Sequence, residues 1–296
     1  MYAKLLILKI IFVAFYSSSR TISSHAQSVS SISDRDLETF SEDLLKKDNS
    51  GLSTHVTYDR QGKTNAASAI DRAAKPLLSV DKKALQHPTV AALLALYDNY
   101  DPDVKNAEVV TNAEKTEESK FLDAIMGTPA MNFTYNYMKQ KGLFNEDRQA
   151  FKEWLAKTWF TLYSRGFRTK SSSAFEHVFL GELKQNQVSG LHNWLFFNDQ
   201  EKNNNLNYMG WMRYEDFGKG SLLKLHYTWK NVDKPVGTLF VGTSPELELS
   251  LYSICYLARP GEKCNFKLNG KPLFIQSYTF TGPKSQKLIG SIYPGV

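Results

Sequence analysis

Two segments near the middle of the chain, Ser172-Ser-Ala-Phe-Glu-His-Val-Phe-Leu-Gly-Glu182 and Val188-Ser-Gly-Leu-His-Asn-Trp194, decide the fold and chemistry that we expect. Each contains one histidine, His177 in the first and His192 in the second. The connection over 184–190 is short and contains turn-forming Asn and Gly. Neighbouring strands could therefore bring both imidazoles into one cleft.

The pattern of the chain changes close to these segments. Upstream, apolar residues recur at helical spacing and predict helices over 33–49, 69–77, 88–99, 114–141 and 146–164. Downstream, short runs rich in aromatic and β-branched residues predict strands over 175–183, 193–198, 206–213, 221–229, 237–242, 271–281 and 287–293. A helix is expected over 245–258, after a Ser-Pro-Glu start. The fold class is α+β, with a helical part at about 33–168 and an antiparallel-sheet part at about 169–296.

The first 26 residues have the features of a secretory signal peptide. A basic start at Lys4 precedes the apolar run 5–15, and Ser24-His-Ala26 provides small residues at a cleavage site. The run is shorter than the ~20 residues that a membrane-spanning helix needs. We expect a secreted, extracellular protein without a membrane partner, in which 27–32 is a short disordered segment and 33–296 is one catalytic domain.

Charge does not identify a partner. The chain carries 36 basic and 30 acidic residues, for a formal charge of +6. Lys4, Lys9 and Arg20 would leave with the signal peptide, so the charge would fall to +3. Such a balance is no electrostatic footprint for nucleic acid, and any RNA binding must depend on a local site.

Covalent features are few. Only Cys255 and Cys264 are present, which excludes a small disulfide-stapled scaffold. The two can pair across the turn 259–262 in an oxidising compartment, or remain unpaired thiols. Asn132-Phe-Thr134 is an acceptor sequence for N-glycosylation.

Two histidines in one cleft suit proton transfer near neutral pH, since one can act as base and the other as acid. Cleavage of RNA by its own 2′-OH needs such a pair, together with a cation that stabilises the charged phosphorane. A zinc site is the alternative, because two histidines with Glu176 or Glu182 form a common ligand set. The spacing lacks the H-E-x-x-H pattern of helical zinc sites. His55, His87 and His226 are expected to be structural.

The segments 172–182 and 188–194 resemble the EndoU family of poly(U)-specific endoribonucleases. Further segments in the same order are similar to this family: Asp71-Arg-Ala-Ala-Lys-Pro-Leu77, Phe121-Leu-Asp-Ala-Ile-Met126, Val241-Gly-Thr-Ser-Pro-Glu246 and Gly290-Ser-Ile-Tyr-Pro294. The resemblance covers about 31–296. It implies an α+β fold and cleavage of single-stranded RNA at uridines, often with Mn²⁺, leaving 2′,3′-cyclic phosphate ends.

The resemblance also implies roles for individual residues. His192 would be the general base, His177 the general acid and Lys234 the catalytic cation, although the sequence itself does not distinguish the acid from the base. A hydroxyl can both donate and accept, which suits a uracil edge, and an aromatic ring gives a base a stacking surface. The implied substrate-binding residues are Thr238, Ser291 and Tyr293. Glu176 and Glu182 match acidic positions that orient the histidines, hold Mn²⁺ or position strands.

We therefore predict a secreted endoribonuclease, monomeric, that acts on single-stranded RNA containing uridine. Two alternatives of other classes remain open from the sequence. One is a secreted RNA-binding module of the same fold without turnover. The other is a metal-dependent hydrolase that acts on a substrate other than RNA.

Overall fold

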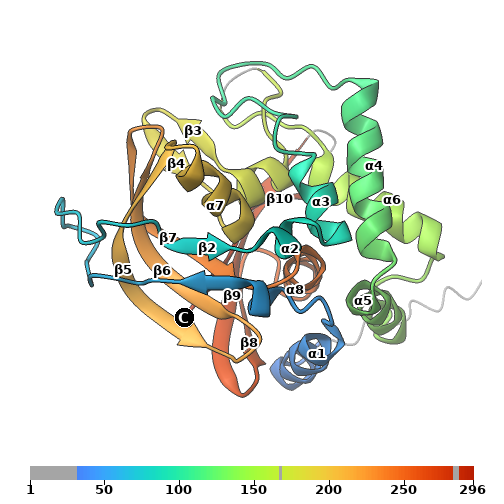
Figure 1. Cartoon of the computed structure of the whole chain (residues 1–296). Coiled ribbons are helices and arrows are strands. Elements are labelled where there is room, and N and C mark those ends of the chain that lie inside the picture. Colours follow the sequence, from blue (N-terminus) through green and yellow to red (C-terminus); the bar gives the residue numbers. More distant parts are fainter. Residues whose placement is uncertain (1–31, 167–168, 283–286) are drawn as a thin grey trace, which may run out of the picture.

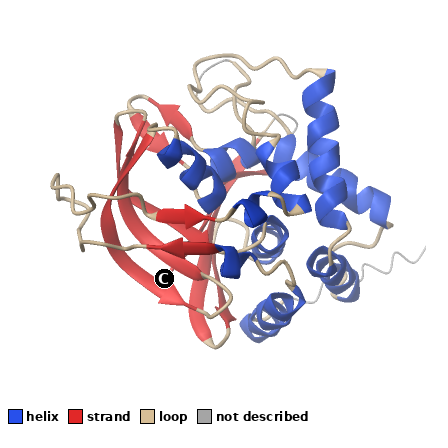
Figure 2. Cartoon of the chain, viewed as in Figure 1, coloured by secondary structure: helices blue, strands red, loops and turns tan. Residues whose placement is uncertain are grey.

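The computed structural model describes residues 32–166, 169–282 and 287–296. Helices gather on one side of the molecule and antiparallel sheets on the other (Figures 1 and 2), as the sequence predicts for an α+β protein. The expected signal peptide 1–26 and residues 27–31 lie outside the described residues. Ile32, the last residue of the segment expected to be disordered, is buried, so the packed chain begins one residue earlier than predicted.

The helical part begins with a strong start signal. Ser33 accepts from the Asp36 amide and the Asp36 carboxylate accepts from the Ser33 amide, which is a capping box. The elements of this part are α1 (Asp34–Lys47), η1 (Leu52–His55), β1 (Val56–Tyr58), β2 (Leu78–Val80), α2 (Lys82–Leu85), α3 (Pro88–Leu94), α4 (Asn112–Met126), α5 (Pro129–Gln140) and α6 (Arg148–Phe160). The α1 and α6 predictions are confirmed within a few residues.

Three helix predictions need correction. The stretch expected as one helix over 114–141 is two helices, because Thr128 caps α5 and Pro129 cannot continue the hydrogen bonding of α4. The helix expected over 88–99 ends at Leu94 and continues as turns. Residues 69–77 form a loop instead of a helix. In this loop Ala73 and Leu77 are buried, which imitates helical spacing.

The C-terminal part contains two three-stranded antiparallel sheets, with strand orders β5-β6-β7 and β10-β9-β8, and a hairpin of β3 and β4. Its elements are η2 (Glu176–Leu180), β3 (Glu182–Lys184), β4 (Gln187–Ser189), α7 (Trp194–Lys202), β5 (Leu206–Asp216), β6 (Ser221–Trp229), β7 (Val232–Val241), α8 (Pro245–Ala258), β8 (Lys263–Leu268), β9 (Lys271–Thr281) and β10 (Lys287–Gly295). The predictions are confirmed, with shifted ends, for the strands at 206–213, 221–229, 237–242, 271–281 and 287–293. The helix predicted at 245–258 is also confirmed.

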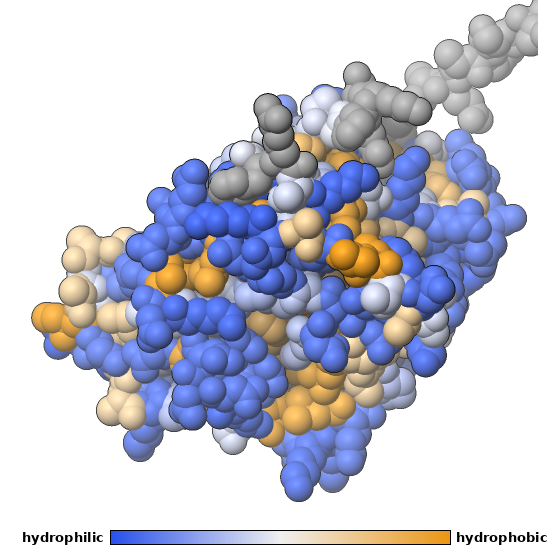
Figure 3. Space-filling model, turned by 90° about the horizontal axis from the view of Figure 1, so that it is seen from above, coloured by the Kyte–Doolittle hydropathy of each residue, from blue (hydrophilic) through white to orange (hydrophobic). Residues whose placement is uncertain are grey.

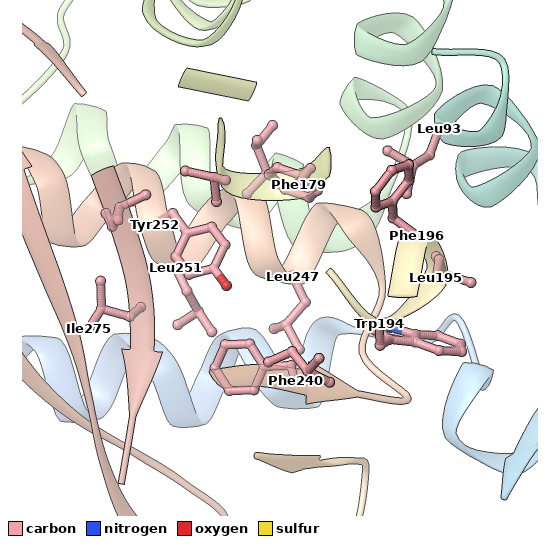
Figure 4. Close-up of a cluster of buried hydrophobic side chains, with 14 of the residues drawn as sticks. Leu93, Phe179, Trp194, Leu195, Phe196, Phe240, Leu247, Leu251, Tyr252 and Ile275 are labelled. Carbon is pink, nitrogen blue, oxygen red and sulfur yellow. The ribbon is translucent and has the colours of Figure 1, made fainter. Parts of the chain in front are cut away.

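Helix α8 lies at the centre of the core and joins the two parts. Its side chains are buried on nearly every face, and it contacts α5 and α3 on one side and β9 and β10 on the other. In Figure 4, Leu251 and Tyr252 of α8 lie near Phe240 of β7, Ile275 of β9 and Phe179 of η2. This packing fixes the two sheets and η2 relative to one another.

Two strand predictions beside the histidines are wrong. Residues 193–198 belong to α7, because the Asn193 side chain accepts from the Leu195 and Phe196 amides and starts a helix. Residues 175–183 form the helical turn η2 followed by β3. The apolar residues of α7 and η2 are buried, so these runs have no helical periodicity to separate them from buried strands. Strand β8 was not predicted.

Several further features bear on the sequence predictions. Cys255 of α8 and Cys264 of β8 form a disulfide with a Cα–Cα distance of 5.5 Å, which confirms the paired alternative. Asn132 is exposed on α5. No helix among the described residues is both long and apolar enough to cross a bilayer. The face in Figure 3 is mainly hydrophilic, with scattered apolar patches.

Candidate active site

His177 is placed by the single helical turn η2. The turn starts with a reciprocal pair, in which Ser173 Oγ accepts from the Glu176 amide and the Glu176 carboxylate accepts from the Ser173 amide. It ends at Gly181, which adopts a φ of 91° that favours glycine. The chain then enters β3, where Glu182 follows at once. This short turn brings Glu182 back beneath the ring of His177.

Both nitrogens of the His177 ring have partners. Nδ1 lies 2.8 Å from Glu182 Oε2, and Nε2 lies 3.0 Å from Ser291 Oγ on β10. Arg165 Nε lies 2.8 Å from the same Glu182 oxygen, so this oxygen contacts both the imidazole and the guanidinium. Burial lowers the pKa of His177 to about 4, with Arg165 adding to the shift and Glu182 opposing it. The ring is therefore neutral at pH 7 in the free protein, with Nδ1–H donated to Glu182.

The backbone joins the second histidine segment to the first. The Leu191 amide donates to the His177 carbonyl at 3.1 Å, and the His192 amide donates to the Val178 carbonyl at 2.8 Å. A Cβ on Gly190 would lie 1.6 Å from the His177 carbonyl oxygen, so only glycine permits this approach. Leu191 takes a positive φ of 63°, which is rare for a branched side chain. The hairpin β3–β4 therefore brings the two imidazoles together, as the sequence predicts.

The His192 ring is held at one nitrogen only. Nδ1 lies 2.7 Å from the Thr238 carbonyl oxygen of β7, which can only accept, so the proton is on Nδ1 and Nε2 carries a lone pair. Among the described residues Nε2 makes no hydrogen bond. Burial lowers the pKa of His192 to about 3, and the Lys234 charge adds to this shift. The Tyr293 ring stacks on the imidazole, with centroids 5.3 Å apart and planes 23° apart.

Lys234 supplies a buried cation to the same place. Its Nζ donates to the Val188 carbonyl of β4 at 2.9 Å, which ties β7 to the hairpin that carries the histidines. Burial lowers the pKa of Lys234 to about 8. Most of the population is therefore charged at pH 7, in an environment where a charge interacts strongly with an anion.

These side chains line one cavity of about 270 Å³. Its lining contains every residue predicted to be catalytic or substrate-binding: His177, His192, Lys234, Thr238, Ser291 and Tyr293. The Thr238 hydroxyl is buried and makes no hydrogen bond among the described residues, so its capacity to donate and accept is unused. The Ser291 hydroxyl is already engaged by His177.

Glu176 lies apart from this cavity. It lines a separate cavity with Glu108 and Tyr100. Burial and the nearby Glu108 raise the pKa of Glu176 well above the usual value for glutamate. Its carboxylate caps η2, so Glu176 supports the turn and does not face the histidines. Of the two acidic residues singled out in the sequence, only Glu182 contacts an imidazole.

The carboxylates do not fit a metal centre. The described residues contain no group of three or more His, Cys, Asp or Glu side chains arranged to hold a metal ion. One oxygen of Glu182 is in addition already in contact with His177 and Arg165. These observations do not favour the zinc alternative, and they give no set of protein ligands for the Mn²⁺ that the resemblance implies.

Sequence reasoning missed two supporting contacts. Arg165 pairs with Glu182 from a loop that shows no periodicity, so no local signal marks it. Glu248, in the Glu-Leu-Glu start of α8, is fully buried. It accepts from the Thr243 hydroxyl at 2.6 Å and from the Asn193 amide group at 3.4 Å, and so steadies the residue that follows His192. Burial raises the pKa of Glu248 to about 8.

Comparison with known proteins places this site. A family model for endoribonuclease XendoU matches residues 36–294. The uridylate-specific endoribonuclease EndoU of Drosophila melanogaster is 36% identical over 265 residues, covering 88% of this chain and 82% of the relative. The human uridylate-specific endoribonuclease is 34% identical over 282 residues, covering 90% of this chain and 67% of the relative. The solved structure of XendoU, a splicing-independent snoRNA-processing endoribonuclease, superimposes with a TM-score of 0.73 at 34% identity, covering 88% of this chain and 96% of that one.

The fold and these comparisons define an RNA-cleaving enzyme of mixed α and β structure. The chain belongs to the endoribonuclease XendoU family. The resemblance to EndoU that the sequence motifs indicate is thereby confirmed.

Proposed function

We propose that this enzyme cleaves single-stranded RNA after uridines by attack of the ribose 2′-OH on the adjacent phosphorus. The observation that carries the proposal is that two buried histidines, His177 and His192, line one cavity together with Lys234. The Nδ1 of His177 contacts a carboxylate and that of His192 a backbone carbonyl. The relatives named uridylate-specific endoribonucleases support the uridine preference. RNA is favoured over DNA because only RNA carries the attacking hydroxyl.

The proposed reaction has two proton transfers, one from the substrate to His192 and one from His177 to the leaving group. His192 Nε2 takes the proton of the 2′-OH while the 2′-oxygen bonds to phosphorus. The P–O5′ bond then breaks, and His177 Nε2 donates a proton to the departing 5′-oxygen. The products are a 2′,3′-cyclic phosphate and a 5′-OH. Lys234 stabilises the negative charge of the phosphorane.

His177 needs a proton to act as the acid, and the bound substrate supplies the reason for gaining one. In the free protein, burial and the charges of Arg165 and Lys234 lower its pKa. A phosphodiester in the cavity adds a negative charge beside the ring and offsets Lys234, so the pKa rises in the complex. The imidazolium is also stabilised by Glu182 at Nδ1.

We assign uridine selection to two residues that line the cavity, Thr238 and Tyr293. The Thr238 hydroxyl can donate to or accept from the uracil edge. The Tyr293 ring offers a stacking surface, which is worth ~1–3 kcal/mol per base. We do not assign Ser291 to the base, because its hydroxyl is hydrogen-bonded to His177.

We also propose that the enzyme is secreted. The signal-like residues 1–26 and the disulfide between Cys255 and Cys264 support this, because disulfides persist in oxidising compartments. No step of the proposed reaction uses Mn²⁺, and the test below measures its effect. The monomeric state and the N-glycosylation acceptor site at Asn132 remain predictions from the sequence.

The test uses the protein lacking residues 1–26 and an end-labelled RNA with a single uridine, with Mn²⁺, without it and with a chelator. We expect one cut after the uridine and a 2′,3′-cyclic phosphate end. A 3′-phosphate formed directly, or cleavage of the same RNA with 2′-deoxyuridine at that position, would contradict attack by the 2′-OH. Folded protein that binds RNA without cutting it would support the binding-module alternative.

A further inference from the structure

His226 lies at an irregular point of the β5-β6-β7 sheet. On one side Leu225 pairs with Gly237 and Tyr227 pairs with Lys234. Two residues of β7 therefore lie opposite His226 alone, which is a β-bulge. Bulges of this kind bend a strand and re-aim its side chains, often beside active sites. The bulge ends at Lys234, the cation of the candidate site.

The β7 side of this bulge lacks one backbone donor. The two residues opposite His226 are Pro235 and Val236, both exposed, and proline has no amide to give to a neighbouring strand. On the other side of β6, the pairing with β5 also slips by one residue, between Tyr208 and Gly210. The β6–β7 ladder is therefore interrupted next to Lys234 and resumes with the pair of Tyr227 and Lys234.

A side-chain contact from the bulge residue of β6 to β7 spans this interruption. His226 Nε2 lies 2.6 Å from Asp233 Oδ1. The imidazole is only 2% exposed, whereas the Asp233 side chain is 55% exposed. Nε2–H donates to the carboxylate, and Asp233 directly precedes Lys234 in the chain. The buried ring thus holds the exposed edge of β7 one residue from the catalytic cation.

We propose that His226 and Asp233 are positioning residues that fix the β7 bulge and thereby aim Lys234 at the scissile phosphate. The inference rests on the proposed role of Lys234 and assigns a function to a histidine expected to be structural. It follows that the contact contributes more to the rate than to stability. A partly exposed polar contact between side chains contributes little to folding, while a 1 Å displacement of a catalytic group can cost about 100-fold in rate.

The test compares four purified variants by single-turnover cleavage of the single-uridine RNA over a range of enzyme concentrations. Asp233→Ala removes the contact. Asp233→Asn keeps an oxygen that accepts from Nε2–H. Thr228→Ala is the matched control, because Thr228 lies directly opposite Asp233 in the register. Lys234→Ala reports whether the cation matters at all.

We expect Asp233→Ala to lower the rate at saturating enzyme about 10- to 100-fold, with half-saturation changed less than twofold. Asp233→Asn should retain at least a third of the wild-type rate, and Thr228→Ala should match the wild type. All variants should keep their thermal unfolding transition above the assay temperature. This pattern would support positioning through the hydrogen bond.

Three outcomes would overturn the proposal. They are a wild-type rate in Asp233→Ala, an equal loss in Asp233→Asn, or an equal loss in Thr228→Ala. The Lys234→Ala variant distinguishes failure of the proposed role of Lys234 from failure of the positioning role alone. If it cleaves like the wild type, the proposed role of Lys234 fails and the positioning role fails with it. If it is inactive while Asp233→Ala is fully active, only the positioning role fails.

Discussion

The two histidine segments share a cavity but hold their imidazoles in different ways. His177 lies between a carboxylate and a hydroxyl, with a partner at each ring nitrogen. His192 is fixed by a backbone carbonyl at Nδ1, and its Nε2 makes no hydrogen bond among the described residues. Both rings are almost fully buried, so burial does not distinguish them.

The difference indicates which histidine can carry a positive charge. Glu182 supplies a full negative charge to the His177 ring and so favours its imidazolium form. The Thr238 carbonyl supplies only a dipole to His192, whose lone pair at Nε2 remains available to a proton. On this ground we propose that His177 is the acid and His192 the base, roles that the sequence leaves interchangeable.

The largest expected effect is the loss of either ring. We expect His177→Ala and His192→Ala each to lower kcat by about 10²- to 10⁴-fold, the range that general acid–base catalysis supplies. Affinity for the RNA should change little, which a binding isotherm with a non-cleavable 2′-deoxyuridine RNA would check. A near-native rate in either variant would contradict the mechanism.

Replacing the carboxylate should remove what makes the two segments different. Glu182→Gln keeps the shape of the side chain but removes the charge that favours imidazolium and that pairs with Arg165. A charge-assisted hydrogen bond is worth ~1.5–3 kcal/mol, so kcat should fall about 10- to 100-fold. The rate is measured at saturating RNA. An unchanged rate would show that His177 does not depend on Glu182.

The pH dependence of the rate should identify Lys234. Its pKa is lowered to about 8, so the cation is lost as pH rises through that value and the rate should fall about tenfold by pH 9. Arginine stays charged over this range. In Lys234→Arg the decrease should therefore move to higher pH, whatever the absolute rate. A decrease at the same pH would assign the titration to another group.

The smallest expected effect concerns Ser291. Ser291→Ala removes a neutral hydrogen bond at His177 Nε2, worth ~1 kcal/mol, so kcat should fall about fivefold. The preference for uridine over cytidine should persist, because Thr238 is assigned to the base. A lost preference, measured on matched RNAs with one pyrimidine, would return Ser291 to the uracil-binding role implied by the resemblance.

Much of the fold followed from local signals in the sequence. Ser33 with Asp36 and Ser244 with Pro245 mark the starts of α1 and α8, and both helices form there. Errors arose where burial erased periodicity. Trp194 to Phe197 are buried on every side, and such a run suits a strand as well as a helix. The strand predicted where η2 forms was wrong for the same reason.

The site was predictable by residue type but not by contact. All the residues predicted to be catalytic or substrate-binding line the cavity. The short hairpin between the histidines explains why the two rings lie close together. Glu176 and Glu182 looked equivalent in the sequence, yet only Glu182 contacts His177. Arg165 reaches Glu182 from an irregular loop. Such contacts depend on the path of the chain in space, which no local pattern reports.

The most direct test of the acid and base assignment uses an RNA in which sulfur replaces the 5′-oxygen of the leaving nucleotide. A thiolate leaves without a proton, so this substrate no longer needs a general acid. We predict that His177→Ala cleaves it at nearly the wild-type rate, while His192→Ala remains inactive. Rescue of His192→Ala, or failure to rescue His177→Ala, would contradict the account.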